Sequence, residues 1–227
     1  MNLRHRAAAV TAAAALVATG LALAPSAQAA APKAAKSPAV AATATGTNSL
    51  AAVLTAGGVG FDKNWNDYDI VTAAVLAVLK AKPTSKVSVL TDGTVALTAF
   101  IPNDRAFRIL AHDLTGKWYK TEKGVFDKLV SKLGINAIEN VLLYHVVPGG
   151  PILAKDALQA NGAKLATALP GASITVRVRG RNVPVIILRD LDHNNFDARV
   201  NPWATNINQG NKQVAHGITR VLRPINL

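Results

Sequence analysis

The segment that most restricts the fold runs from Asn140 to Gly150, where an apolar helical pattern changes abruptly into an extended one. One helix face recurs at i, i+3, i+4 and i+7, formed by Ile138, Val141, Leu142 and His145. The β-branched pair Val146-Val147 follows, and Pro148 cannot continue a helix. We therefore predict that Tyr144 and His145 lie at a buried joint between a helix and a strand.

The N-terminal region has the pattern of an export signal. Arg4 and Arg6 precede the apolar run Ala7–Ala24, and Ala27-Gln28-Ala29 offers small residues at a cleavage site. We predict a signal peptide over 1–29, an Ala/Pro/Thr/Lys-rich linker over 30–48 and one domain over 49–227. No later segment approaches the ~20 uninterrupted apolar residues of a membrane span, so we expect no span in the mature chain.

Composition restricts the chemistry of the chain. There is no cysteine, which excludes disulfides, thiol catalysis and cysteine metal sites. Lys and Arg number 25 against 13 Asp and Glu, a formal net charge of +12. A charge of this sign favours anionic polymers, envelope components or nucleic acid as partners, and does not select among them.

Helix signals dominate the first half of the domain. A helix capped by Asp69 should run through Lys80, and Pro102-Asn103-Asp104 should end a strand over Thr94–Ile101 and cap the next helix. Val125–Leu133 has one apolar face and a glycine stop at Gly134. The helix that leads to the joint should begin at a capping box formed by Asn136 and Glu139.

Strand signals dominate the second half. Ser173–Arg179 alternates apolar and polar residues with the period of a half-buried strand. Further strands are predicted over Lys164–Leu169, Asn182–Arg189 and Ala215–Leu222. This order of elements predicts an α+β domain with a strand-rich core and helices packed around it, the helices lying mainly in the first half.

Two basic surfaces are candidate binding sites. Alternation places four arginines on one exposed sheet face: Arg177, Arg179, Arg181 and Arg189. A lysine stripe including Lys128 and Lys132 is either a second binding surface or an ordinary solvated helix face. No aromatic residue for base stacking occurs between Ile174 and Arg189, so we do not expect nucleic-acid binding.

Motifs for catalysis and cofactors are missing from the sequence. The histidines have no metal-ligand spacing, and there is neither a nucleophile elbow nor a phosphate-binding glycine loop. We therefore predict no enzyme activity and no cofactor, although a triad assembled in space around Ser173 stays open. One oxygen-rich loop has alternate spacing typical of a calcium loop, but its turn glycine and terminal glutamate are missing; its candidate ligands are Asp190, Asp192, Asn194 and Asp197.

Three segments, in order, resemble the fasciclin domain family. The first two are Leu97–Phe107, containing Pro102-Asn103, and Asn140–Gly149, containing Tyr144-His145; the third is Val214–Pro224, containing His216. The resemblance spans about residues 49–227 and suggests a secreted bacterial fasciclin-like protein. It implies a wedge-like β-sandwich with flanking helices, used outside the cell for adhesion, with binding or motif positions at Pro102, Asn103, Tyr144, His145 and His216.

The expected function is thus a secreted, non-enzymatic adhesion or envelope-interaction module, with possible retention at a bacterial cell wall. Its partner would be a cell-surface or matrix protein or an anionic envelope polymer. The alternative is a carrier whose apolar interior holds a small hydrophobic ligand or lipid. Whether Tyr144 and His145 are structural or contact a partner, and the oligomeric state, stay open.

Overall fold

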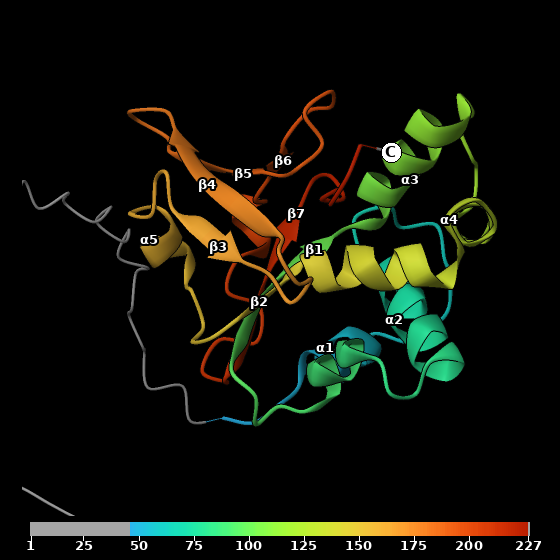
Figure 1. Cartoon of the computed structure of the whole chain (residues 1–227), viewed down its shortest axis with the longest axis horizontal. Coiled ribbons are helices and arrows are strands. Elements are labelled where there is room, and N and C mark those ends of the chain that lie inside the picture. The colour runs from blue at the N-terminus through green and yellow to red at the C-terminus, as the bar shows by residue number, and fades with distance from the viewer. Residues whose placement is uncertain (1–45, 227) are drawn as a thin grey trace, which may run out of the picture. The chain divides into compact units, whose positions relative to one another are not determined.

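The computed structural model of the chain describes residues 46–226 (Figure 1). The predicted signal peptide and residues 30–45 of the predicted linker lie outside this range. The helices are α1 (Leu50–Thr55), α2 (Asp69–Ala81), α3 (Asp104–Thr115), α4 (Glu122–Tyr144) and α5 (Ala154–Ala157). The strands are β1 (Leu97–Pro102), β2 (Val146–Pro148), β3 (Lys164–Ala166), β4 (Ser173–Arg179), β5 (Val185–Arg189), β6 (Ala198–Arg199) and β7 (Gln213–Ile218). None of the helices in this range is long and apolar enough to cross a bilayer.

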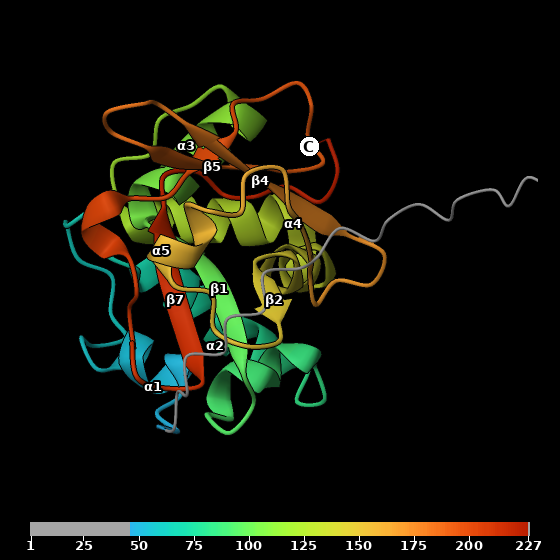
Figure 2. The same ribbon diagram turned by 90° about the vertical axis from the view of Figure 1, so that its left-hand side faces the viewer.

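The strands form two sheets. The first has the order β2-β1-β7, in which β1 pairs antiparallel with β2 and parallel with β7 (Figure 2). The second is an antiparallel sheet in the order β3-β4-β5-β6. The predicted α+β class, with helices mainly in the first half and a sandwich of strands, is confirmed.

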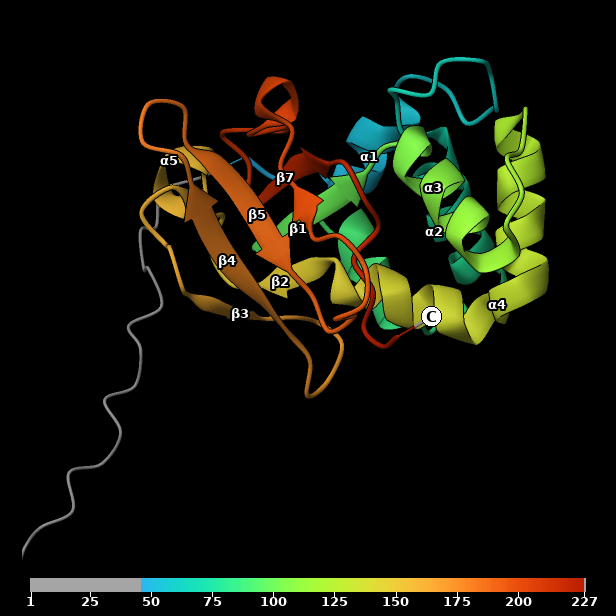
Figure 3. The same cartoon turned by 90° about the horizontal axis from the view of Figure 1, so that it is seen from above.

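The first sheet is covered on both faces. Helices α1 to α4 lie on one side of β1 and β7, and β3 to β5 lie on the other (Figure 3). Leu97, Ala99 and Ile101 of β1 face the helical core, whereas Phe100 packs with Ile174 and Leu188 of the second sheet. All six residues of β1, and all six of β7, are therefore buried.

The second sheet is covered on one face only. In β4, Ile174 and Val176 are buried while their neighbours Thr175 and Arg177 are not, which is the alternation that the sequence predicts. The outer face of this sheet is the part of the strand layers that meets solvent.

The predicted helix ends are confirmed in part, because Asp69 is the first residue of α2 and not its cap. The Asn103 side chain accepts a hydrogen bond from the backbone N–H of Ala106 and caps α3. Gly134 interrupts α4 with a positive φ of 74°, a conformation that glycine adopts without strain.

The predicted capping box at Asn136 is wrong. The Glu139 carboxylate instead accepts hydrogen bonds from the Lys82 ammonium and the Ser85 hydroxyl, which approach from the end of α2.

The predicted joint is confirmed. Helix α4 ends at Tyr144, His145 is its C-cap, and β2 begins at Val146. Strand β2 pairs with β1 through Ala99 opposite Val146. The joint thus connects the helical layer to the central sheet.

Candidate functional site

The outer face of the second sheet carries a row of basic side chains. The strand register places Arg177 opposite Ile187, and Ile187 opposite Arg199, so these three residues share one face across β4, β5 and β6. Thr175 lies opposite both Lys164 and Arg189, which puts these two on the same face. We call this surface the arginine face; it consists of Lys164, Arg177, Arg179, Arg189 and Arg199.

The spacing on this face suits a repeating anionic ligand. Neighbouring strands in a sheet lie about 4.8 Å apart, and residues i and i+2 along a strand about 7 Å apart. Arg177 and Arg179 are related by such a step along β4. The guanidinium groups can therefore contact successive acidic groups of one extended ligand.

The arginine face has no acidic partner in an ion pair among the residues that the structure describes. Within residues 46–226, the ion pairs involve none of its five basic residues. The Arg177 Nε atom is buried and has no hydrogen-bond partner in the same range. A guanidinium donates five hydrogen bonds in a planar fork that matches carboxylate, sulfate and phosphate groups. The guanidinium groups of the arginine face are thus available to bind an oxyanion.

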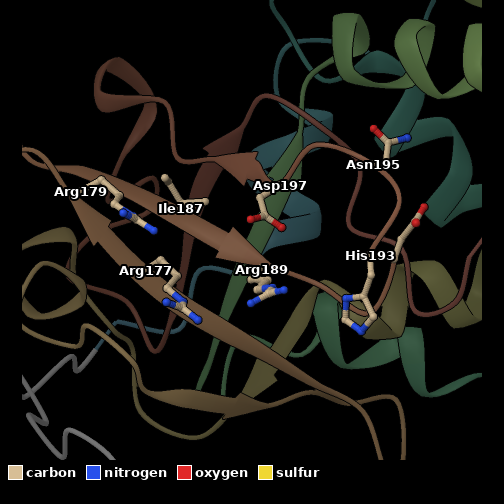
Figure 4. Close-up of a pocket in the computed structure, with 8 residues that line it drawn as sticks. Arg177, Arg179, Ile187, Arg189, His193, Asn195 and Asp197 are labelled. Carbon is tan, nitrogen blue, oxygen red and sulfur yellow. The ribbon is translucent and has the colours of Figure 1, made fainter.

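A cavity of about 310 Å³ opens on this face, lined by Arg177, Arg179, Ile187, Arg189, Asp192, His193, Asn195 and Asp197. Figure 4 shows the guanidinium groups of Arg177, Arg179 and Arg189 over β4 and β5, with His193, Asn195 and Asp197 on the connection that follows β5. Asp197 is the acidic residue of the lining whose carboxylate has no ion pair within the described range. The cavity is predominantly basic.

The sequence identified only part of this surface. Arg181 lies beyond the end of β4, in the turn that follows Gly180, and does not line the cavity. Lys128 and Lys132 belong to α4, in the helical layer. Lys164 and Arg199 were missed, because they join the face through strand pairing. Their exposed positions within short strands were the available signal, but the register was needed to use it.

Tyr144 and His145 are enclosed by the joint. The Tyr144 hydroxyl donates to the backbone oxygen of Ser173 at 2.9 Å, which ties α4 to the second sheet. The Nε2 atom of His145 accepts from the backbone N–H of Leu222 at 3.0 Å, so its Nδ1–H donates to the Val141 oxygen at 2.7 Å. Burial lowers the pKa of His145 to about 4. Both side chains have structural partners and no open face.

The other motif residues are buried or, in the case of Asn103, partly buried. Pro102 ends β1, and Asn103 caps α3. The His216 Nε2–H donates to the Ile152 oxygen at 2.8 Å, and its Nδ1 accepts from the Asn206 N–H at 3.4 Å. Burial lowers the pKa of His216 as well. The residues of the family motifs therefore hold the layers together.

In the candidate calcium loop, protein groups contact the acids. Asp190 accepts hydrogen bonds from the N–H groups of Asp192 and Arg223, and Asp192 accepts from the Asn194 N–H and forms an ion pair with the Arg223 guanidinium at 3.2 Å. Arg223 also pairs with Asp113 at 2.5 Å. The groups of three or more acids close enough for a metal ion in residues 46–226 do not include this loop.

The triad around Ser173 that the sequence leaves open is not assembled in the described range. The rings of His145 and His216 hydrogen-bond to backbone groups, and neither contacts the Ser173 hydroxyl. Asp104 and Asp113, which lie at opposite ends of α3, contact different groups. No catalytic geometry is formed by these residues.

The volumes of the cavities show where a carrier could hold a small ligand. The one beside His145 and the one among α2, α3 and α4 each measure about 30 Å³. Sites for small ligands measure about 300–1,000 Å³. A groove of about 600 Å³ lies between Lys86–Val89, β1 and Thr167–Pro170, and it is open to solvent. A hydrophobic ligand of that size would bind in the groove or require the core to open.

Comparison with known proteins places this fold in a family. No curated protein matches the chain in sequence. A structure of a pair of FAS1 domains from the insect cell adhesion molecule fasciclin I is similar over 66% of this chain and 44% of that chain, with 17% identity and a TM-score of 0.43. The chain thus spans less than half of that structure. The fasciclin domain model matches residues 71–224, from α2 to the residues after β7. The chain therefore belongs to the fasciclin domain family, a family of cell adhesion modules typical of extracellular and surface proteins.

Proposed function

We propose that the chain is a secreted, non-enzymatic adhesion or envelope-interaction module that binds an anionic polymer of the cell envelope or matrix through the arginine face. The observation that carries this proposal is that five basic side chains share an exposed sheet face and form no ion pair within residues 46–226. The pattern of residues 1–29 supports export, and membership of an adhesion family supports a role in contact.

The chemistry of the face favours carboxylated or sulfated glycans and phosphate-rich wall polymers. Arginine binds such groups with paired, charge-assisted hydrogen bonds, which are stronger than bonds between neutral groups. The Arg177 side chain lines the cavity, and its Nε atom has no hydrogen-bond partner among residues 46–226. An extended polymer can engage several of these arginines at once, which raises its affinity above that of one site.

The direct test is binding of the purified protein to an immobilised sulfated glycan and an immobilised polyuronate across a salt series. Binding should weaken as salt rises, because the Debye length falls from about 10 Å at 0.1 M to about 3 Å at 1 M. Binding that ignores salt, or no binding to either polymer, would contradict the arginine face as the contact surface.

A charge-matched pair of variants shows whether the face or the net charge is responsible. Arg177→Ala combined with Arg189→Ala removes two positive charges from the face, and Lys128→Ala combined with Lys132→Ala removes two from α4. We expect the arginine variant to bind at least about 10-fold more weakly, and the lysine variant to bind nearly as well as the original chain. Equal losses in both variants would point to non-specific attraction.

The carrier function remains a second candidate, because the open groove of about 600 Å³ is large enough for a small hydrophobic ligand. Its test is organic extraction of the purified protein followed by mass spectrometry. A stoichiometric lipid would favour the carrier; an empty extract would leave the groove without a ligand.

A further inference from the structure

A second group of charged residues lies in the helical layer, away from the outer face of the second sheet. Five acidic residues gather there, and we call them the acid cluster: Asp62, Asp67, Asp69, Asp104 and Glu122. Asp62, Asp69 and Glu122 offer oxygens that all lie within 4.8 Å of one another, and so do Asp67, Asp104 and Glu122. Glu122 belongs to both groups.

Several elements bring these acids together. Asp69, Asp104 and Glu122 are the first residues of α2, α3 and α4. The Asp104 carboxylate accepts hydrogen bonds from the N–H groups of Asp69 at 3.2 Å and Ile70 at 2.8 Å, so it caps the neighbouring helix α2. The Glu122 Oε2 accepts from the Asp62 N–H at 2.7 Å and holds the loop before α2.

No basic side chain among residues 46–226 pairs with the acids of the cluster. Within residues 46–226, none of the five acids forms an ion pair, although Lys and Arg number 25 in the chain. Each helix N-terminus offers the equivalent of about half a positive charge. Three N-termini therefore offset only a minor part of the charge of five ionised carboxylates.

Two oxygens in the cluster are buried and have no hydrogen-bond partner in the described part of the chain. Glu122 is 0% exposed, and its Oε1 atom accepts no hydrogen bond within the described range. The Asp67 Oδ1 atom is also buried and accepts no hydrogen bond within the described range. A buried acceptor without a donor is unfavourable, and an acidic oxygen in such a position is satisfied by a cation or by a proton.

Burial and crowding disfavour the ionised form of these carboxylates. Burial and the neighbouring Asp67 raise the pKa of Asp104 to about 9. Burial also raises the pKa of Glu122 and that of Asp69. A bound divalent cation would satisfy the two buried oxygens, Glu122 Oε1 and Asp67 Oδ1.

We propose that the acid cluster is a calcium site, with Glu122 as the ligand shared by both groups of oxygens. The candidate ligands are all carboxylate oxygens, which hard cations prefer, and the exposed loop residue Asp62 gives the site the flexibility that calcium tolerates and magnesium does not. The ion would fix the loop before α2 to the N-termini of α3 and α4.

Thermal unfolding and calorimetric titration with calcium chloride test this site. After chelator treatment, about 5 mM calcium should raise the Tm of the full chain by about 5 °C, if the affinity lies near the 0.1 mM of extracellular calcium modules. Magnesium at the same concentration should give a smaller shift. An unchanged Tm and no binding heat with calcium would overturn the proposal.

Glu122→Gln and Asp127→Asn form a matched pair of variants, because each removes one acid from α4. Glu122→Gln should lose the calcium-induced shift in Tm, whereas the exposed Asp127, which pairs with Lys123, should be dispensable. Asp62→Asn changes an exposed residue and should weaken calcium binding at least about 10-fold even if Glu122→Gln fails to fold. A calcium shift retained in both Glu122→Gln and Asp62→Asn would refute the site, and so would its loss in Asp127→Asn alone.

Discussion

The arginine face is positive and the acid cluster is negative, and the two sets of charges differ in their exposure to solvent. The arginines are spread along strands on a surface that meets solvent, so their charges persist and screening by salt controls their reach. The acids converge at three helix N-termini, with Asp104 and Glu122 fully buried, so their charges must be neutralised in place. In a chain of net charge +12, this separation shows that the fold keeps the two sets apart instead of pairing them.

The largest effect should follow from reversing charge on the arginine face. Arg177→Glu combined with Arg189→Glu should weaken binding to an anionic glycan about 100-fold or more, because repulsion replaces two charge-assisted contacts. The same reversal at Lys128 and Lys132 is the control for net charge. Surface plasmon resonance measures the affinity of both variants for the glycan. Comparable losses of affinity would show that net positive charge, and not the arginine face, controls binding.

His145 shows a third response to burial, namely loss of the charge itself. Its folded pKa of about 4 lies below the ordinary histidine pKa of 6.5, so its contribution to stability is complete above pH 6.5 and is lost as the pH falls towards 4. Between pH 7 and pH 5 the loss should be about 2 kcal/mol.

Urea unfolding of the original chain and of His145→Gln at pH 7 and pH 5 checks this. The difference between the two proteins isolates the histidine from Asp190, whose pKa burial raises to about 6 and which acts in the opposite direction. A difference that does not change with pH would mean that His145 titrates normally in the folded state.

Removing one acid from the cluster should stabilise the protein when no cation is available. In chelator, we expect Glu122→Gln to raise the free energy of unfolding by about 1 kcal/mol, because a neutral amide replaces one of several crowded carboxylates. Arg177→Ala should change it by less than about 0.5 kcal/mol, as usual for a surface substitution. Chemical denaturation compares the two; a destabilised Glu122→Gln would show that the carboxylate is needed without metal.

The smallest effect concerns the acid that remains on the basic surface. Asp197 lines the arginine cavity, and Asp197→Asn removes repulsion of an anionic ligand. Affinity for the glycan should rise about two- to threefold, in the range of a single exposed charge. A decrease would mean that Asp197 orients the arginines.

Local patterns predicted the elements and the joint well. The helix cap at Asn103, the interruption at Gly134 and the exit through Val146 depend on neighbours in sequence. The Asn136 capping box failed because Lys82 and Ser85, more than 50 residues away, hold Glu139. A local signal is overridden when a distant partner offers a stronger contact.

Two loops show most clearly what the sequence leaves open. Asp190, Asp192 and Asn194 alternate in the same way as Asp62, Asn64 and Asn66, and in each loop a side-chain oxygen accepts from the backbone N–H two residues later. Only the first loop receives Arg223, which pairs with Asp192, and only the second meets Glu122 and Asp104.

Adjacent residues suffice to predict that the arginines of β4 point outward and that a helix changes to a strand after Tyr144, because both features follow from local backbone geometry. The tertiary structure decided which arginines share a face, since strand register added Lys164 and Arg199. It also decided that the Asp190 loop meets Arg223 whereas the Asp62 loop meets Glu122 and Asp104, because these residues come from distant parts of the chain. The sequence shows where each charged residue stands, but only the fold shows which distant residue lies beside it.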